Sequence, residues 1–142
     1  MKITLERKDN DFHFETKNDR GHVVYIDHKA KGEKAEGPSP MELLLMGVVG
    51  CSAIDVVSIL KKQRQEITSY KAEVVGDRVE VDGAKPFKDI HVTISLEGQI
   101  TPEKAYRAAQ LSFEKYCSVS KTIEPTATIH YNVNLNGQTI EK

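Results

Sequence analysis

The chain has few cysteines and lacks the features that mark several common classes of protein. Its 142 residues include two cysteines, 66 positions apart, which form neither a CxxC pair nor a zinc-ligand spacing. It has no basic block or arginine-rich arm, and its formal net charge of -1 argues against a nucleic-acid-binding surface. It also has no internal repeat, low-complexity segment or glycine-rich phosphate-binding loop. Cys51, one of these two cysteines, is the first candidate for chemistry.

The length and the N-terminus predict a single domain in the cytoplasm. At 142 residues the chain can build one hydrophobic core but not two, so we predict one domain over residues 1–142. The N-terminal residues MKITLERKDND contain no apolar signal core, so we expect a cytoplasmic protein. In that compartment both cysteines are normally reduced.

The segment from Gly37 to Gln63 predicts a long helix around which the rest of the chain is organised. Ser39 suits the N-cap, Pro40 the first helical position and Glu42 the third. This is the pattern of a capping box, in which the serine and the glutamate satisfy backbone groups at the start of the helix. We therefore expect a helix that begins at Pro40.

The same helix is apolar on nearly every side. Cys51 lies in its middle, within the apolar run that extends from Leu43 to Leu60. A helix of this kind must be buried on every side. Asp55 interrupts the run, and the run is at the lower limit for a membrane span, so we predict a buried helix and no membrane insertion. Asp55 is expected either to accept a hydrogen bond in an interface or to line a small polar channel.

Alternating apolar residues predict strands on both sides of this helix. Three short strands precede it, near residues 3–5, 12–14 and 22–27, and the charged residues 29–37 should form an exposed, mobile loop. Two strands follow, at 68–81 and 87–96, then a second helix with Thr101 as its cap, a short helix at 117–123 and a last strand near the C-terminus. This order predicts an α+β fold in which antiparallel sheet covers helices.

The central helix also predicts a homodimer. A monomer of this size can cover one face of the helix with sheet, but scarcely all of it. Gly47 and Gly50 would let a second backbone approach closely. We therefore predict a two-fold dimer in which the central helices pack together.

Two motifs resemble the signatures of a known family. Pro40-Met41-Glu42-Leu43, with Cys51 nine residues after the glutamate, resembles the first signature of the OsmC/Ohr family, and the segment KYCSVSK at 115–121 resembles the second. The order of elements matches as well, so the resemblance covers nearly the whole chain. The lysine-rich loop at 28–37 and the lack of a clear arginine motif are more similar to the less characterised OsmC-like branches.

The resemblance implies a fold, an activity and partners. The fold is OsmC-like, with antiparallel sheets wrapped around a long central helix in an intertwined homodimer. The activity is that of a thiol-dependent peroxidase that reduces small organic hydroperoxides in oxidative-stress defence, with a dithiol as reductant and no cofactor.

The resemblance also implies roles for four residues. Cys51 would be the peroxidatic cysteine and Cys117 the resolving one. Glu42 would hold an arginine that activates the attacking thiol, and Arg20 lies in about the region where Ohr-type members carry theirs. Nine helical positions put Glu42 and Cys51 on opposite sides of the helix, so Glu42 would act through a cation or on the cysteine of the partner subunit. If no arginine reaches the site, a lysine or the helix dipoles would have to serve.

Chemistry permits this reaction but leaves open which cysteine attacks. A thiolate attacks a peroxide oxygen to give sulfenic acid, and a second thiol condenses with it. Cys117 precedes a predicted short helix whose N-terminus would lower its pKa, so local reasoning favours Cys117 as the attacking thiol, whereas the resemblance favours Cys51. Each cysteine can also simply be a small buried core residue.

The remaining polar residues predict no metal, and two non-catalytic functions stay open. Five histidines show no close ligand spacing and should be surface residues: His13, His22, His28, His91 and His130. The apolar neighbours of Cys51, including Val48, Val49 and Ile54, predict a pocket for alkyl chains. One alternative is a non-catalytic OsmC-like dimer that binds a small apolar ligand at the subunit interface, and the other is a structural or stress-associated dimer.

Overall fold

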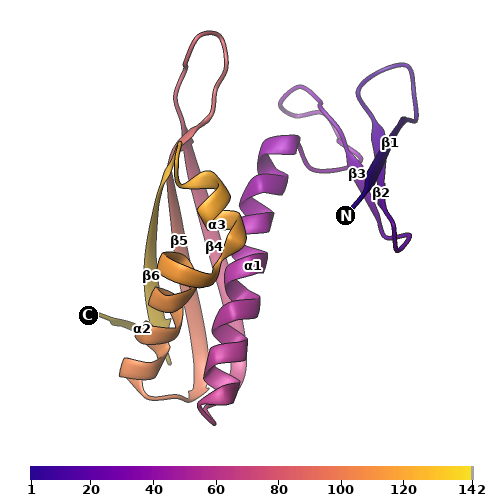
Figure 1. The fold of residues 1–142 in the computed structure, drawn as a ribbon. Coiled ribbons are helices and arrows are strands. Elements are labelled where there is room, and N and C mark those ends of the chain that lie inside the picture. The colour runs from indigo at the N-terminus through magenta and orange to yellow at the C-terminus, as the bar shows by residue number, and fades with distance from the viewer. Residues whose placement is uncertain (142) are drawn as a thin grey trace. The chain divides into compact units, whose positions relative to one another are not determined.

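The structure is a computed structural model that describes residues 1–141, with two sheets, a long helix and shorter helical segments (Figure 1). Its elements are β1 (Ile3–Arg7), β2 (Phe14–Asn18), β3 (Val23–Ile26), α1 (Pro40–Lys62), β4 (Glu66–Arg78), β5 (Phe87–Gln99), α2 (Pro102–Leu111), the π-helical turn η1 (Ser112–Tyr116), α3 (Ser118–Ile123), β6 (Thr128–Leu135) and β7 (Gln138–Ile140). The predicted α+β class is confirmed. The chain forms two compact units, Met1–Leu44 and the residues from Leu45 onward, and α1 runs through the boundary.

The first unit is an antiparallel three-stranded sheet in the order β1-β2-β3. The three strands predicted from alternation are therefore present, although Phe12 precedes β2 rather than lying in it. Residues 28–37 carry no helix or strand and are mostly exposed, as expected. The buried carboxylate of Asp27 closes this loop by accepting hydrogen bonds from the backbone N–H groups of Glu36 (2.9 Å) and His28 (2.7 Å), and these bonds lower the pKa of Asp27.

The second unit contains a four-stranded sheet in the order β4-β5-β6-β7. The pairs β4/β5 and β6/β7 are antiparallel, but β5 and β6 are parallel. The expectation of antiparallel sheet throughout is thus wrong for this pair. From the end of β5 the chain passes through α2, η1 and α3. This crossover carries it back to the end of the sheet at which β5 began, so β6 runs parallel to β5.

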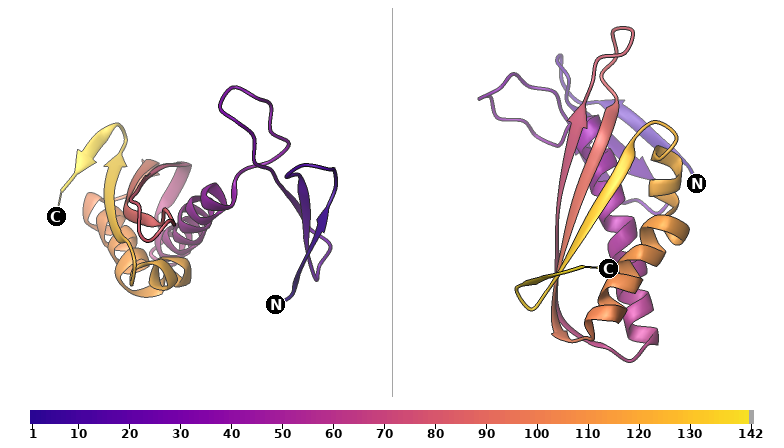
Figure 2. Two further views of the ribbon diagram at one scale, coloured as in Figure 1. Left: turned by 90° about the horizontal axis from the view of Figure 1, so that it is seen from above. Right: turned by 90° about the vertical axis from the view of Figure 1, so that its left-hand side faces the viewer.

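The core of the second unit lies between one face of this sheet and the helices. Figure 2 shows α1, α2 and α3 on the same face. Alternate residues of β5 are buried, namely Ile90, Val92, Ile94 and Leu96. From α1 a single stripe is buried, formed by Val48, Ser52, Val56 and Leu60. Because these four residues recur at every fourth position, they lie along one side of the helix.

The other sides of α1 are open in the single chain. Ile54 is 73% exposed, Met46 52% and Leu44 44%. By length and composition α1 could cross a membrane, with a mean hydropathy of 2.3 over its most apolar 18 residues, of which 22% are buried. The sequence argument required a helix that is buried on every side. A single chain does not provide all of that burial.

The two glycines of α1 differ in their surroundings. A Cβ atom on Gly50 would meet nothing within 4 Å, so this position is open to an incoming backbone. A Cβ atom on Gly47 would instead lie 3.5 Å from a methyl group of Val119 in α3. Val119 of the same subunit therefore packs against Gly47, and the approach of a second backbone at Gly47 stays a prediction.

Candidate active site

Cys51 lies in the middle of α1, beside its buried stripe. The next residue, Ser52, is fully buried, whereas Cys51 is half-buried. Asp55 follows four residues later and is also half-buried. Residues four apart lie on the same face of a helix, so the sequence itself places this thiol and this carboxylate side by side.

Cys117 lies between the π-helical turn η1 and α3. Its backbone N–H donates to the carbonyl of Ser112 (2.8 Å), which closes the wide turn, and its own extended backbone makes it the N-cap of α3. Its sulfur accepts hydrogen bonds from the backbone N–H of Ser120 (3.4 Å) and from the Ser120 hydroxyl (3.0 Å). The thiol is fully buried. Single π turns of this kind occur frequently at functional sites.

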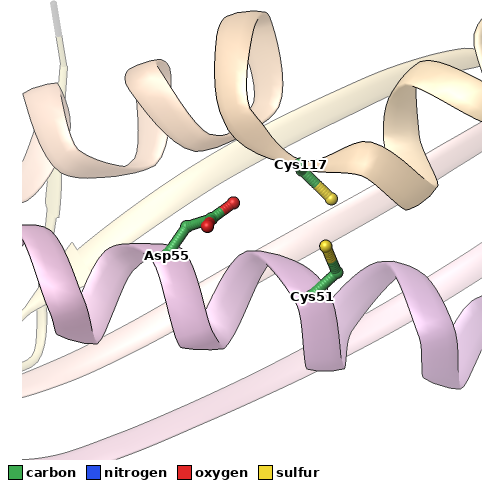
Figure 3. A group of neighbouring side chains, drawn as sticks. All are labelled: Cys51, Asp55 and Cys117. Carbon is green, nitrogen blue, oxygen red and sulfur yellow. The ribbon is translucent and has the colours of Figure 1, made fainter.

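The fold brings these two cysteines together from positions 66 residues apart. The Sγ atoms of Cys51 and Cys117 and a carboxylate oxygen of Asp55 all lie within 4.8 Å of one another. In Figure 3 the two thiols point toward each other, one from α1 and one from the start of α3, with Asp55 one turn further along α1. Both cysteines are free. They are therefore neighbours rather than separate core residues.

Asp55 is held in place by the element that also carries Cys117. The hydroxyl of Ser112, the first residue of η1, donates to Oδ2 of Asp55 at 3.0 Å. Ser112 is fully buried. Neither Ser112 nor Ser120 was identified from the sequence. Ser120 had a usable signal, because it stands three residues after the N-cap, whereas nothing in the sequence marks Ser112.

Burial raises the pKa of the Cys117 thiol, and the nearby Cys51 thiol adds to this effect. The two hydrogen bonds from Ser120 oppose the shift but do not outweigh it. The prediction that the start of α3 would lower this pKa is therefore wrong. The helix has six residues, and the cost of desolvating a thiolate exceeds what its N-terminus provides.

Glu42 forms the predicted capping box. Its carboxylate accepts hydrogen bonds from the backbone N–H of Ser39 (2.7 Å) and from the Ser39 hydroxyl (2.8 Å), and the N–H of Glu42 donates back to that hydroxyl (3.3 Å). These bonds lower the pKa of Glu42. The side chain is exposed, and within residues 1–141 no lysine or arginine pairs with it. The cap is confirmed, and a catalytic role for Glu42 stays a prediction.

Arg20 lies in the turn after β2. Its backbone N–H donates to the side chain of Asn18, and its own side chain is exposed. Arg20 and Glu42 both belong to the unit Met1–Leu44, whereas the two cysteines belong to the other unit. The contact of Arg20 with the thiols is thus a prediction as well.

A cavity of about 530 Å³ opens along α1 beside Asp55. Asp55 contributes to its wall, and the other lining residues are Ser58, Ile59, Lys62, Gln63, Leu111 and Tyr116. The apolar pocket expected from Val48, Val49 and Ile54 is not formed by the single chain. Val48 is fully buried and Ile54 is largely exposed, because six helical positions separate them by about 240°. The cavity lies instead on the side of Asp55, and neither cysteine is among its lining residues.

The histidines predicted as surface residues are mostly exposed. His13 is the exception, since it is half-buried with Nε2 inaccessible. His91 and His130 stack across β5 and β6 with their ring centres 4.7 Å apart, and they pair with Asp77 and Asp89 respectively. No local pattern in the sequence indicates this stacked pair, because it depends on the parallel register of the two strands.

Comparison with known proteins places these cysteines in a family. The sequence profile of the family described as OsmC-like protein matches residues 31–132, which is more than half of the chain and includes both cysteines. The chain belongs to the OsmC-like protein family. Its resemblance to the OsmC/Ohr signatures is thereby confirmed. Glu42 also lies within the matched residues, whereas Arg20 lies outside them.

Three known proteins are similar to this OsmC-like chain in sequence or in structure. Protein YhfA of Escherichia coli strain K12 is 40% identical over 113 residues, which cover 79% of this chain and 81% of the relative. A hypothetical protein from Aquifex aeolicus VF5, solved by crystallography, has 31% identity and a TM-score of 0.79, covering 95% of this chain and 96% of its own. An organic hydroperoxide resistance protein from Elizabethkingia anophelis has 16% identity and a TM-score of 0.72, covering 94% of both chains, and at that identity it shows the shared fold alone.

Proposed function

We propose that this OsmC-like protein is a thiol-dependent peroxidase that reduces organic hydroperoxides through Cys51 and Cys117. The observation that carries the proposal is the approach of the two sulfurs to within 4.8 Å. A disulfide needs an S–S distance of about 2.05 Å, so the sulfurs must close by less than about 3 Å. Support from relatives comes from the shared fold, because one of the similar structures is named as an organic hydroperoxide resistance protein.

The reaction has two balanced steps. The Cys51 thiolate attacks one oxygen of the hydroperoxide, the O–O bond breaks, and the alkoxide leaves with a proton as the alcohol, so that Cys51 becomes a sulfenic acid. The Cys117 thiol then attacks the sulfenic sulfur, and water leaves as the disulfide forms. An external dithiol returns two electrons and two protons by thiol–disulfide exchange.

The burial of the two thiols supports Cys51 as the attacking group. Cys51 is half-buried, whereas Cys117 is fully buried and its pKa is raised by that burial. A peroxide from solvent meets the more exposed sulfur first, and a protonated thiol is a poor nucleophile. Cys117 is better suited to the second step, in which its target is already beside it.

The attacking thiol also needs a cation nearby. The charged group within 4.8 Å of both sulfurs is the acid Asp55, which does not favour a thiolate. The proposed cation is Arg20, positioned by Glu42. An arginine here would stabilise the thiolate and orient the peroxide, since its planar guanidinium offers several donors.

A second copy of the chain is the proposed cover for the open sides of α1. Exposed Leu44, Met46 and Ile54 form apolar surface on this helix, and Gly50 leaves room for a close approach. Exposed apolar side chains gathered on one element commonly mark an interface. An arrangement with the two copies of α1 packed together would bury the helix as its composition requires.

Ile54→Glu should convert the homodimer to a monomer. Burial of an unpaired carboxylate in the interface should weaken dimerisation by more than about a hundredfold. The matched control is Val75→Glu on β4, because Val75 is also exposed and apolar but lies on the sheet rather than on α1. Analytical ultracentrifugation of both variants checks this. A wild-type monomer, or a dimer unaffected by Ile54→Glu, would rule out this interface.

Titration of the reduced protein with cumene hydroperoxide, followed by intact mass analysis, tests the proposed function. Loss of two hydrogens per chain at one equivalent is the expected result, because it reports the Cys51–Cys117 disulfide. Stepwise gain of oxygen without that loss would mean that Cys117 does not resolve. An unchanged mass would refute the peroxidase. It would favour the non-catalytic alternative, in which the dimer binds an apolar ligand near the cavity of about 500 Å³ that Ala53, Ile54 and Val57 help to line.

A further inference from the structure

The group formed by Cys51, Asp55 and Cys117 contains the ligand types of a metal site. Zn²⁺ binds thiolates and carboxylates, and open sites of this metal use three protein ligands and leave a fourth position to water or substrate. We propose that the reduced protein binds one soft divalent cation of the Zn²⁺ type through the two Sγ atoms and a carboxylate oxygen of Asp55. This proposal does not depend on the peroxidase reaction.

The distances are compatible with such a site. Each of the three donor atoms lies within 4.8 Å of the other two. With Zn–S bonds of about 2.3 Å and tetrahedral angles, the two sulfurs of a zinc site are about 3.8 Å apart. The two sulfurs therefore need to move together by at most about 1 Å, which small side-chain rotations provide. Figure 3 shows the two sulfurs pointing toward each other and the carboxylate of Asp55 on the same side of α1.

Two buried serines orient the proposed ligands. The Ser112 hydroxyl donates to Oδ2 of Asp55 (3.0 Å), and the Ser120 hydroxyl donates to the sulfur of Cys117 (3.0 Å). Both serines are fully buried. Hydrogen bonds of this kind to metal ligands hold them in position and are worth about 10- to 100-fold in metal affinity. Asp55 and Cys117 are therefore each held in place by a buried hydrogen-bond donor.

The cavity beside Asp55 offers an approach to the carboxylate of the proposed site. It measures about 530 Å³ and reaches the carboxylate that takes part in the group. Lys62 also lines this cavity and carries a charge of the wrong sign for a cation. Its backbone is seven positions from Asp55, about 10.5 Å along the helix. Within residues 1–141 its ammonium group forms no ion pair with Asp55.

The sequence argument against a metal considered ligands that lie close together in the chain. Cys51 and Cys117 are 66 residues apart, and the fold alone makes them neighbours. A metal bound to both sulfurs and a disulfide between them exclude each other, because the disulfide leaves neither sulfur as a thiolate. Loss of two electrons from the thiol pair should therefore release the ion.

Titration of the reduced, full-length protein with Co²⁺ tests the site. Cobalt bound by thiolates gives a sulfur-to-metal charge-transfer band in the near ultraviolet, and a tetrahedral site gives visible ligand-field bands. We expect both to saturate at one Co²⁺ per chain and to disappear when Zn²⁺ is added or when the disulfide is formed. A wild-type protein without the charge-transfer band at one equivalent would refute the proposal.

Three variants and one control assign the ligands. Cys51→Ser and Cys117→Ser should each reduce the charge-transfer band to about half or less, since one thiolate of two is lost. Asp55→Asn should weaken Co²⁺ binding by at least about tenfold while the folded structure is kept, because an amide oxygen can still accept the bond from Ser112. The control Asp77→Asn removes an exposed acid that pairs with His91 on the sheet and should change nothing.

The outcomes separate this proposal from the peroxidase. An unchanged charge-transfer band in Cys51→Ser would overturn the site. Binding of Co²⁺ without any sulfur-to-metal band would also overturn it, and would point to His91 and His130 as the ligands. A protein that binds Co²⁺ through both cysteines but is not oxidised by hydroperoxide would refute the peroxidase and leave the metal site standing. Normal peroxide reduction by a protein that gives no cobalt band would refute the metal site and leave the peroxidase standing.

Discussion

Cys51→Ser should reduce turnover of organic hydroperoxide by at least about a thousandfold, because the variant lacks the sulfur that attacks the O–O bond. A serine hydroxyl has nearly the same shape but stays protonated at neutral pH, so it cannot replace a thiolate. Cys117 cannot take over, since its thiol is fully buried and its pKa is raised by that burial. The measurement is the rate of hydroperoxide consumption with a small dithiol as reductant.

A matched variant distinguishes loss of chemistry from loss of fold. Ser52→Ala changes the residue next to Cys51 by one oxygen atom, in a position that is fully buried in the same helix. Its hydroxyl donates to the carbonyl of Val49 within its own helix (3.2 Å). The variant should therefore fold and retain most of the activity. Near-normal turnover in Cys51→Ser would transfer the attacking role to Cys117 and overturn the assignment by family resemblance.

The elements that were predicted well are those whose signals are local. Ser39, Pro40 and Glu42 fix the start of α1, and the hydrogen bonds of the capping box are present. Alternation along β5 correctly gave the buried face that carries Ile90 and Val92. In each case the residues that form the pattern are also the residues that make the contacts, so no knowledge of distant parts of the chain was needed.

The pairing of strands was predicted less well, for two different reasons. The hairpin of β6 and β7 was overlooked although Asn136-Gly137 is a strong turn signal, and both residues have positive φ (50° and 83°). The parallel pairing of β5 with β6 had no such local signal. It follows from the path of the chain through α2, η1 and α3, which is a property of the whole fold.

The site shows the same division between local and distant information. Cys51 and Asp55 could be placed together from their spacing of four residues in one helix. The approach of Cys117 came only from resemblance to a family, because separation in the chain permits contact but does not imply it. The pKa of Cys117 was predicted in the wrong direction, since burial depends on what packs around the thiol and not on the helix that follows it.

Cys117→Ser should allow one oxidation of Cys51 and then stop the enzyme. The first hydroperoxide converts Cys51 to sulfenic acid at the wild-type rate, but no second thiol lies beside it to form the disulfide. We therefore expect a burst of one alcohol per chain, followed by turnover at least about a hundredfold slower that depends on attack by external thiol. Rapid mixing with cumene hydroperoxide, and intact mass after trapping with dimedone, should show one added dimedone per chain.

The pH dependence of the wild type provides the counterpart of this variant. Because burial raises the pKa of the Cys117 thiol, only a small fraction is thiolate at neutral pH, and that fraction grows as the pH rises. The rate of disulfide formation should therefore increase with pH across the neutral and weakly alkaline range, while the sulfenic acid of Cys117→Ser persists at every pH.

Ser120→Ala removes the hydroxyl bond to the Cys117 sulfur, and this bond opposes the rise in the pKa of Cys117. The variant should therefore move the rate profile to still higher pH. A disulfide rate that falls with rising pH, or rapid turnover in Cys117→Ser, would show that another group resolves the sulfenic acid.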